Sequence, residues 1–128
     1  MVMFADTRAF SGFAVGDLQA AQKFYGEVLG IATSERGGLM TLHLAGGRDT
    51  LVYPKPGHVP AEYTILNFPV DDIDAAVDEL SARGVTFERY DGLAQDARGI
   101  SRGYGPDIAW FRDPAGNILA VLHESTAP

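Results

Sequence analysis

Apolar residues along this chain follow two different periods, and glycine or proline ends most of the stretches. Apolar and β-forming composition predicts strands at 9–15, 39–45, 50–53, 63–70 and 85–90. Two other stretches have apolar residues at helical spacing and predict helices. One runs from about Asp17 to Leu29, and the other begins after Asp72. An aspartate can accept the free N–H groups of a first helical turn, and Gly30 and Gly84 stand where the two helices would end. The pattern predicts an α+β protein.

The stretch from Ile108 to Glu124 is two apolar runs joined by a turn. Asp113 and Pro114 begin the turn, and Gly116-Asn117 supplies residues that tolerate a positive φ angle. The stretch therefore predicts a hairpin whose second strand is the last strand of the sheet.

The two halves of the chain repeat one order of elements. Val15-Gly-Asp-Leu-Gln-Ala-Ala corresponds to Val70-Asp-Asp-Ile-Asp-Ala-Ala, and each half reads β-α-β-β-β. We place a first module at about 9–54 and a second at about 62–124 of one domain, 1–128, with the proline-rich stretch 54–60 as the linker. Since neither module is large enough to bury a sheet alone, we expect one sheet face to carry the helix and the other to curve over something or be covered by a partner.

Composition removes several function classes. The 128 residues include no cysteine, which excludes disulfides and thiolate nucleophiles. The formal net charge of −7 disfavours nucleic acid as a partner, because phosphate backbones are also negative. No apolar stretch approaches the ~18 residues of a membrane span, and the N-terminus lacks the features of a signal peptide. We expect a cytoplasmic protein without a membrane partner.

Three motifs carry a resemblance to a known superfamily, over roughly residues 9 to 124. They are Val15-x-Asp17-Leu18 with Phe24-Tyr25-x-x-x-Leu29-Gly30, then Val70-x-Asp72-Ile73 with Ala75-Ala76 and Gly84, and finally Trp110-Phe111-Arg112-Asp113-Pro114-x-Gly116-Asn117. In order and spacing, the chain resembles the vicinal oxygen chelate superfamily of glyoxalases, bleomycin-resistance proteins and extradiol dioxygenases. The resemblance implies two paired βαβββ modules forming a cup-shaped mixed sheet, usually in a homodimer.

The same resemblance implies positions for a divalent metal, and this chain departs from them. Where relatives commonly carry histidine on the two module-opening strands, this chain has Phe10 and Ile65, and where they carry glutamate on the last strand it has Ala120. The fourth position falls within 50–53, which contains neither an acid nor a histidine. These side chains cannot bind a divalent cation, so we expect no metal cofactor.

Histidines elsewhere offer little for a different metal site. We expect His43 to be packed or on the surface, and His58 to be solvated in the linker. His123 and its neighbour Glu124 should point to opposite faces of a strand.

Strand alternation predicts which residues line the apolar cup. The candidate ligand-binding residues are Phe10, Tyr53, Ile65, Asn67, Trp110, Ala120 and Glu124, with Gly12, Ala14 and Leu122 on the same faces and His43 and Tyr104 at the rim. Three of these have ordinary alternatives: Asn67 could bond to backbone or water, Trp110 could be core, and Glu124 could be solvated.

Residues 91–106 form a polar stretch with four glycines. One interpretation is a lid over the cup, in which Arg98 or Arg102 meets an anion. The alternative is a surface loop without a role.

Three hypotheses for the function follow. The first is a metal-independent protein that binds a small organic molecule, as drug-sequestering relatives do. The second is a lyase, isomerase or dioxygenase, which without metal would need an acid–base pair from Asn67, Tyr53, Glu124 or His43, and no such pair is evident. The third is a regulatory or protein-interaction module that reuses the fold.

Overall fold

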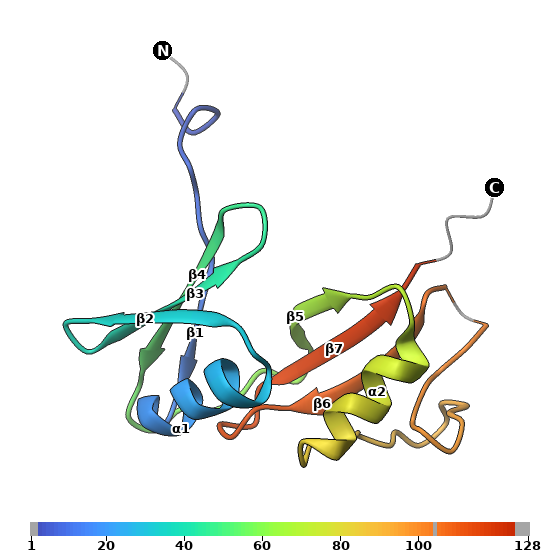
Figure 1. The fold of residues 1–128 in the computed structure, drawn as a ribbon. Coiled ribbons are helices and arrows are strands. Elements are labelled where there is room, and N and C mark those ends of the chain that lie inside the picture. Colours follow the sequence, from blue (N-terminus) through green and yellow to red (C-terminus); the bar gives the residue numbers. More distant parts are fainter. Residues whose placement is uncertain (1–2, 104, 125–128) are drawn as a thin grey trace. The chain divides into compact units, whose positions relative to one another are not determined.

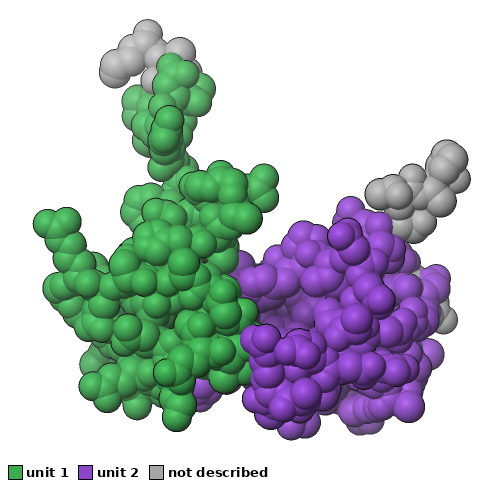
Figure 2. Space-filling view, in the orientation of Figure 1, with its two compact units in different colours: residues 1–57 green, residues 58–128 purple. Residues whose placement is uncertain are grey.

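The computed structural model describes residues 3–103 and 105–124 and divides the chain into two compact units. Figure 2 colours Met1–Gly57 as unit 1 and His58–Pro128 as unit 2, so the division lies inside the proline-rich stretch. Each unit has its own sheet and its own helix packed on that sheet (Figure 1). The predicted α+β class is confirmed.

Unit 1 contains β1 (Gly12–Val15), α1 (Leu18–Gln22), η1 (Lys23–Val28), β2 (Ala32–Arg36), β3 (Leu39–Leu44) and β4 (Arg48–Pro54). The strand order is β1-β4-β3-β2, with β1 parallel to β4 and the other neighbours antiparallel. Asp17 caps α1 by accepting the backbone N–H groups of Gln19 and Ala20, as predicted. The helix continues as the π-helix η1, with the N–H of Leu29 bonded to the carbonyl of Phe24 at 2.9 Å.

The core of unit 1 lies between this helix and one face of the sheet. Its buried side chains are Val15, Ala21, Tyr25, Met40, Leu42 and Val52. Gly12 allows β1 and β4 to approach closely, because a Cβ atom there would lie 2.9 Å from the carbonyl oxygen of Leu51.

Two features of unit 1 differ from the sequence prediction. The first strand begins at Gly12 instead of Ala9, and the backbone bond from Leu51 N to Ser11 O joins β4 to the residue just ahead of it. The pattern also does not single out β2, because Ala-Thr-Ser-Glu-Arg is mostly exposed at the sheet edge and lacks apolar alternation.

Unit 2 contains β5 (Thr64–Pro69), α2 (Ile73–Ala82), β6 (Asp107–Arg112) and β7 (Ile118–His123). The order is β5-β7-β6, with β5 parallel to β7 and β6 antiparallel to it. Asp72 caps α2 through the N–H of Ala75, and Gly84 follows the helix with φ +92°. The core contains Ile73, Val77, Ile100, Ala109, Phe111, Leu119 and Val121.

The predicted hairpin is confirmed, and its turn is held by one carboxylate. Asp113, 4% exposed, accepts the N–H groups of Ala115 and Asn117 at 2.9 Å and the side-chain amide of Asn117 at 3.0 Å. Gly116 has φ +87°, the left-handed conformation that the sequence predicts for this turn.

The predicted strand at 85–90 is wrong. Phe87 makes only an isolated bridge with Phe111, supported by a 2.8 Å bond from Glu88 N to Trp110 O. The Gln95 side chain occupies the other edge: its amide donates to the carbonyls of Glu88 and Gly99, and its oxygen accepts the N–H of Tyr90. A side chain from the following loop therefore takes hydrogen bonds that a regular ladder would use.

No helix in the described part of the chain is both long enough and apolar enough to cross a bilayer.

Candidate functional site

Strand register sorts the side chains of unit 2 onto two sheet faces. Phe111 and Leu119 pair with each other, are buried, and lie on the face that packs against α2. Asn67, Ala120 and Trp110 form a row on the opposite face, because Ala120 is the register partner of both others. We call this the helix-free face of unit 2. Three of the predicted ligand-binding residues thus lie side by side.

An aromatic hollow lies between the start of β5 and the indole ring on β6. The indole N–H of Trp110 donates to Thr64 Oγ1 at 3.1 Å, and the Tyr90 ring lies edge-on to the indole with centroids 5.5 Å apart. The hollow has a volume of ≈ 210 Å³ and is lined by Glu62, Tyr63, Thr64, Tyr90, Trp110 and Ile118. The hydrogen bond and the edge-on contact hold the indole ring in one orientation.

A charged pair adjoins the hollow. The Arg112 guanidinium bonds to the Glu88 carboxylate and also donates to the carbonyl of Gly116. Hydrogen bonding to Glu88 raises the pKa of Arg112. Burial, and then the nearby Glu88 charge, raise the pKa of the Tyr90 phenol, so Tyr90 carries a neutral hydroxyl near pH 7 and can donate a hydrogen bond.

The other predicted residues of unit 2 lie away from this row. The ladder between β5 and β7 shifts register between Thr64 and Leu66, so a bulge at Ile65 interrupts the simple alternation used to place it. Glu124 is exposed and follows the end of β7. Tyr63 and Tyr90 line the hollow and were not predicted as ligand-binding residues. The sequence signal for them is an aromatic residue at the start of the predicted strand 63–70 and another at the end of the predicted strand 85–90.

In unit 1, Tyr53 lies where alternation predicts. It pairs with Ala14 on the face opposite the buried Val52, and its exposed fraction is 38%. Phe10 does not share that strand face, because β1 begins two residues later; its side chain is 70% exposed. It instead lines a hollow of ≈ 530 Å³ with Arg8, Ala9, Ser11, Gly47, Arg48, Asp49 and Thr50.

The three histidines each have a polar neighbour. His43 is exposed, as one predicted alternative holds, and contacts Ser34 and Asp49. His58 is not solvated as predicted: it is half-buried, with Nε2 3.1 Å from the Asn117 side-chain oxygen. His123 Nδ1 lies 2.9 Å from the carbonyl of Val70.

The positions that the resemblance assigns to metal ligands carry no donor side chain in this chain. Phe10, Ile65 and Ala120 have no ligating atom, and Ala120 is fully buried in the sheet. Within residues 3–103 and 105–124, no three His, Cys, Asp or Glu side chains gather as a metal site would require.

The segment 91–103 is bound to α2 by ion pairs. Arg98 makes two bonds to the Asp78 carboxylate, at 2.8 and 3.2 Å, and Arg102 contacts Asp74, Asp96 and Asp107. Ile100 anchors the segment in the core at 1% exposure. Both arginines that were predicted to meet an anion therefore already face carboxylates of the same unit. Tyr104, a predicted rim residue, lies outside the described residues.

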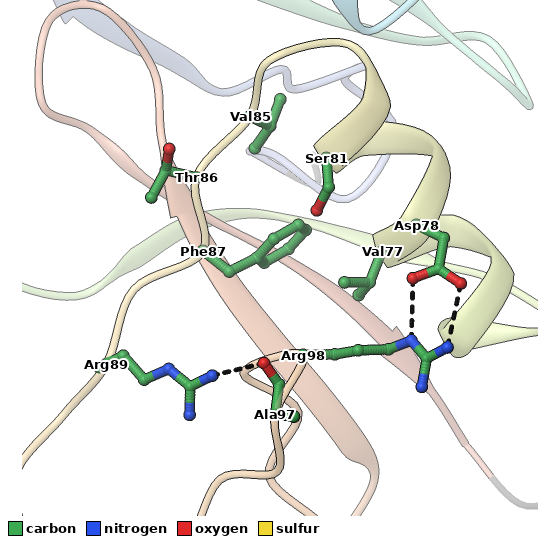
Figure 3. Close-up of a pocket in the computed structure, with 9 residues that line it drawn as sticks. All are labelled: Val77, Asp78, Ser81, Val85, Thr86, Phe87, Arg89, Ala97 and Arg98. Atoms are coloured by element: carbon green, nitrogen blue, oxygen red, sulfur yellow. Dashed lines mark hydrogen bonds and ion pairs between the residues drawn. The ribbon is translucent and has the colours of Figure 1, made fainter.

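These contacts border a third hollow, of ≈ 380 Å³, on the α2 side of unit 2. Figure 3 shows Phe87 pointing into it toward Val77 and Ser81 of α2, with Arg98 reaching Asp78. Arg89 donates to the backbone carbonyls of Asp96 and Ala97 at 2.7 Å. Because the Arg89 guanidinium is already bonded to the loop, we interpret this hollow as part of the packing between the loop and α2. It is distinct from the helix-free face.

Comparison with known proteins places the chain in a family. A family model described as Glyoxalase/Bleomycin resistance protein/Dioxygenase superfamily matches residues 9–121. No curated protein matches the sequence.

Solved structures share the fold at low identity. The antibiotic binding protein TnmS3 from Streptomyces sp. CB03234 has a TM-score of 0.67 at 22% identity, with 94% of this chain and 98% of that one covered. For the fosfomycin resistance protein FosX from Mesorhizobium loti the TM-score is 0.66 at 13% identity, with 96% of each chain covered. A glyoxalase/dioxygenase from Nostoc punctiforme has a TM-score of 0.67 at 15% identity, covering 98% of this chain and 97% of that one. The chain belongs to the glyoxalase/bleomycin resistance protein/dioxygenase superfamily.

Proposed function

We propose that this protein binds a small organic molecule with a flat apolar part, without a metal, on the helix-free face of unit 2. The observation that carries the proposal is the fixed Trp110 ring beside Tyr90 and the exposed Tyr63. Ligand sites combine apolar and aromatic walls with a few placed polar groups, and here the Tyr90 hydroxyl, Thr64 and Asn67 are available for that role.

Two further points support binding rather than metal-assisted catalysis. The resemblance assigns metal-ligand positions to Phe10, Ile65 and Ala120, and none of these side chains has an atom that binds a divalent cation. TnmS3 is an antibiotic binding protein and FosX a fosfomycin resistance protein, so this fold supports recognition of small molecules in those proteins.

The test uses Trp110, the one tryptophan of the sequence, as the reporter. Its fluorescence is followed while bleomycin and the planar dye 8-anilinonaphthalene-1-sulfonate are titrated separately into metal-free protein. We expect saturable quenching by at least one probe, and about fivefold weaker binding in Tyr90→Ala, since one aromatic contact contributes on the order of 1 kcal/mol. Asp71→Asn, an exposed residue of the same unit that does not line the hollow, is the control and should bind as the parent does.

Two results would refute the proposal. One is the absence of saturable binding by either probe. The other is binding that requires added Ni²⁺, Zn²⁺, Mn²⁺ or Fe²⁺, together with about one metal per chain in elemental analysis and a metal-dependent rise in melting temperature.

A further inference from the structure

Three polar side chains cross the helix-free face of the unit 1 sheet in one hydrogen-bonded line. Ser34 lies on β2, His43 on β3 and Asp49 on β4. Ser34 Oγ is 2.8 Å from His43 Nε2, and His43 Nδ1 is 3.1 Å from Asp49 Oδ1. His43 is the direct register partner of Asp49, so the pair is held by the β3–β4 ladder.

Hydrogen-bond chemistry fixes the direction of this line. A carboxylate can only accept, so the neutral imidazole carries its proton on Nδ1 and donates it to Asp49. Nε2 is then the acceptor, and the Ser34 hydroxyl donates to it. This is the connectivity in which a serine is activated as a nucleophile, with the imidazole as general base and the carboxylate as its orienting group.

Apolar and hydrogen-bond-donating residues share the strand face of Ser34. Thr41 is the register partner of Ser34, and Leu39 is the register partner of Arg36, two residues further along β2 on the same face. Leu39 is 45% exposed and offers apolar surface on this face, and Thr41 and Arg36 carry hydrogen-bond donors on the same face as Ser34.

We propose that Ser34, His43 and Asp49 form a nucleophile–base–orienting triad that hydrolyses small carboxylic esters. Ser34 Oγ bonds to the ester carbonyl carbon as its proton passes to His43 Nε2. The carbon–oxygen bond to the leaving alcohol then breaks, and the alcohol takes that proton. Water next attacks the acyl-serine while His43 accepts its proton, and the acid leaves as the proton returns to Ser34 Oγ. Asp49 is a positioning residue in this scheme.

The experiment measures turnover of p-nitrophenyl acetate by the full chain and labelling by a fluorophosphonate, whose adduct is located by mass spectrometry. We expect the label on Ser34, and Ser34→Ala and His43→Ala should each lower kcat at least tenfold. Asp49→Asn should lower kcat about tenfold with KM unchanged, because it disturbs the imidazole tautomer rather than substrate contact. All three side chains are exposed, so the melting temperatures should remain close to that of the parent.

Ser81→Ala, an exposed serine on α2, is the matched control and should leave turnover and labelling unchanged. The proposal is overturned by any of three results: no turnover above buffer, full activity in Ser34→Ala, or an adduct on another residue. Hydrolysis that persists in Ser34→Ala but is lost in His43→Ala would identify direct attack by the imidazole and would likewise overturn it.

Discussion

At the residue scale, single polar atoms decide local structure. The Asp113 carboxylate satisfies three N–H groups inside the turn between β6 and β7. In Asp113→Ala these buried N–H groups lose their acceptor. We therefore expect the free energy of unfolding to fall by about 3 kcal/mol and the melting temperature by about 10 °C. Denaturant titration measures the loss.

Asp113→Asn keeps one side-chain oxygen at this position and should recover part of the loss. Equal stability of the alanine variant and the parent would show that water replaces the carboxylate in the turn.

Some residue positions follow from the local sequence, and others depend on pairing between distant strands. Cap residues, turn glycines and the strand faces of Ala120 and Trp110 follow from local rules, because capping and alternation act over a few neighbours. Phe10 and Ile65 are different: where β1 starts and where β5 bulges depend on hydrogen bonds to β4 and β7, which are distant in sequence. Ser34 and Asp49 join His43 only through such pairing, so no local motif marks them.

At the element scale, the contact between segment 91–103 and α2 depends on ionisation. Hydrogen bonding to Arg98 lowers the pKa of Asp78. At Asp96 burial acts in the opposite direction, but backbone N–H groups and Arg102 outweigh it and lower that pKa too. Since the folded-state pKa values lie below the unfolded ones, the folded state binds fewer protons. The stabilisation is present above the ordinary aspartate pKa near 3.8 and is lost as pH falls through the lowered values.

We therefore expect Asp78→Asn to melt below the parent at pH 7 and low salt, with the difference shrinking as the pH falls below 3.8. The effect should be small and reduced by salt, because both partners are about half exposed. Thermal melts over the pH range measure it. Asp71→Asn, exposed ahead of the α2 cap, is the control, and a pH-independent difference for Asp78→Asn would contradict the ion-pair explanation.

Elements also divide into those that sequence patterns predict and those they do not. The two capped helices and the final hairpin have strong local signals. The segment 85–90 has strand composition, yet its edge is taken by Gln95, and propensity contains no information about a competing side chain.

At the scale of the whole molecule, several large apolar side chains are exposed. Met3, Phe4 and Phe10 lie on the segment ahead of β1 and are 68–75% exposed, and Val59 is 82% exposed. We propose a homodimer, as the superfamily resemblance implies, because isolated apolar surface of this kind is covered in many assemblies.

Light scattering during size exclusion should give twice the chain mass, and Phe4→Ser with Phe10→Ser should shift the population toward monomer. Asp6→Ser, on the same segment, is the matched control. A monomer at tens of micromolar parent protein would contradict this assignment.

The side-chain amide of Gln95 can hydrolyse slowly during storage, and its hydrogen bonds determine what that reaction changes. Its nitrogen donates to two carbonyl oxygens, and its oxygen receives the N–H of Tyr90, which borders the aromatic hollow. Slow hydrolysis of this amide to a carboxylate would remove both donors and set a negative charge against the two carbonyls. A stored preparation would thus lose the wall of its ligand site at Tyr90 while the two sheets remained folded, so its shelf life for binding would be shorter than its shelf life as a folded protein.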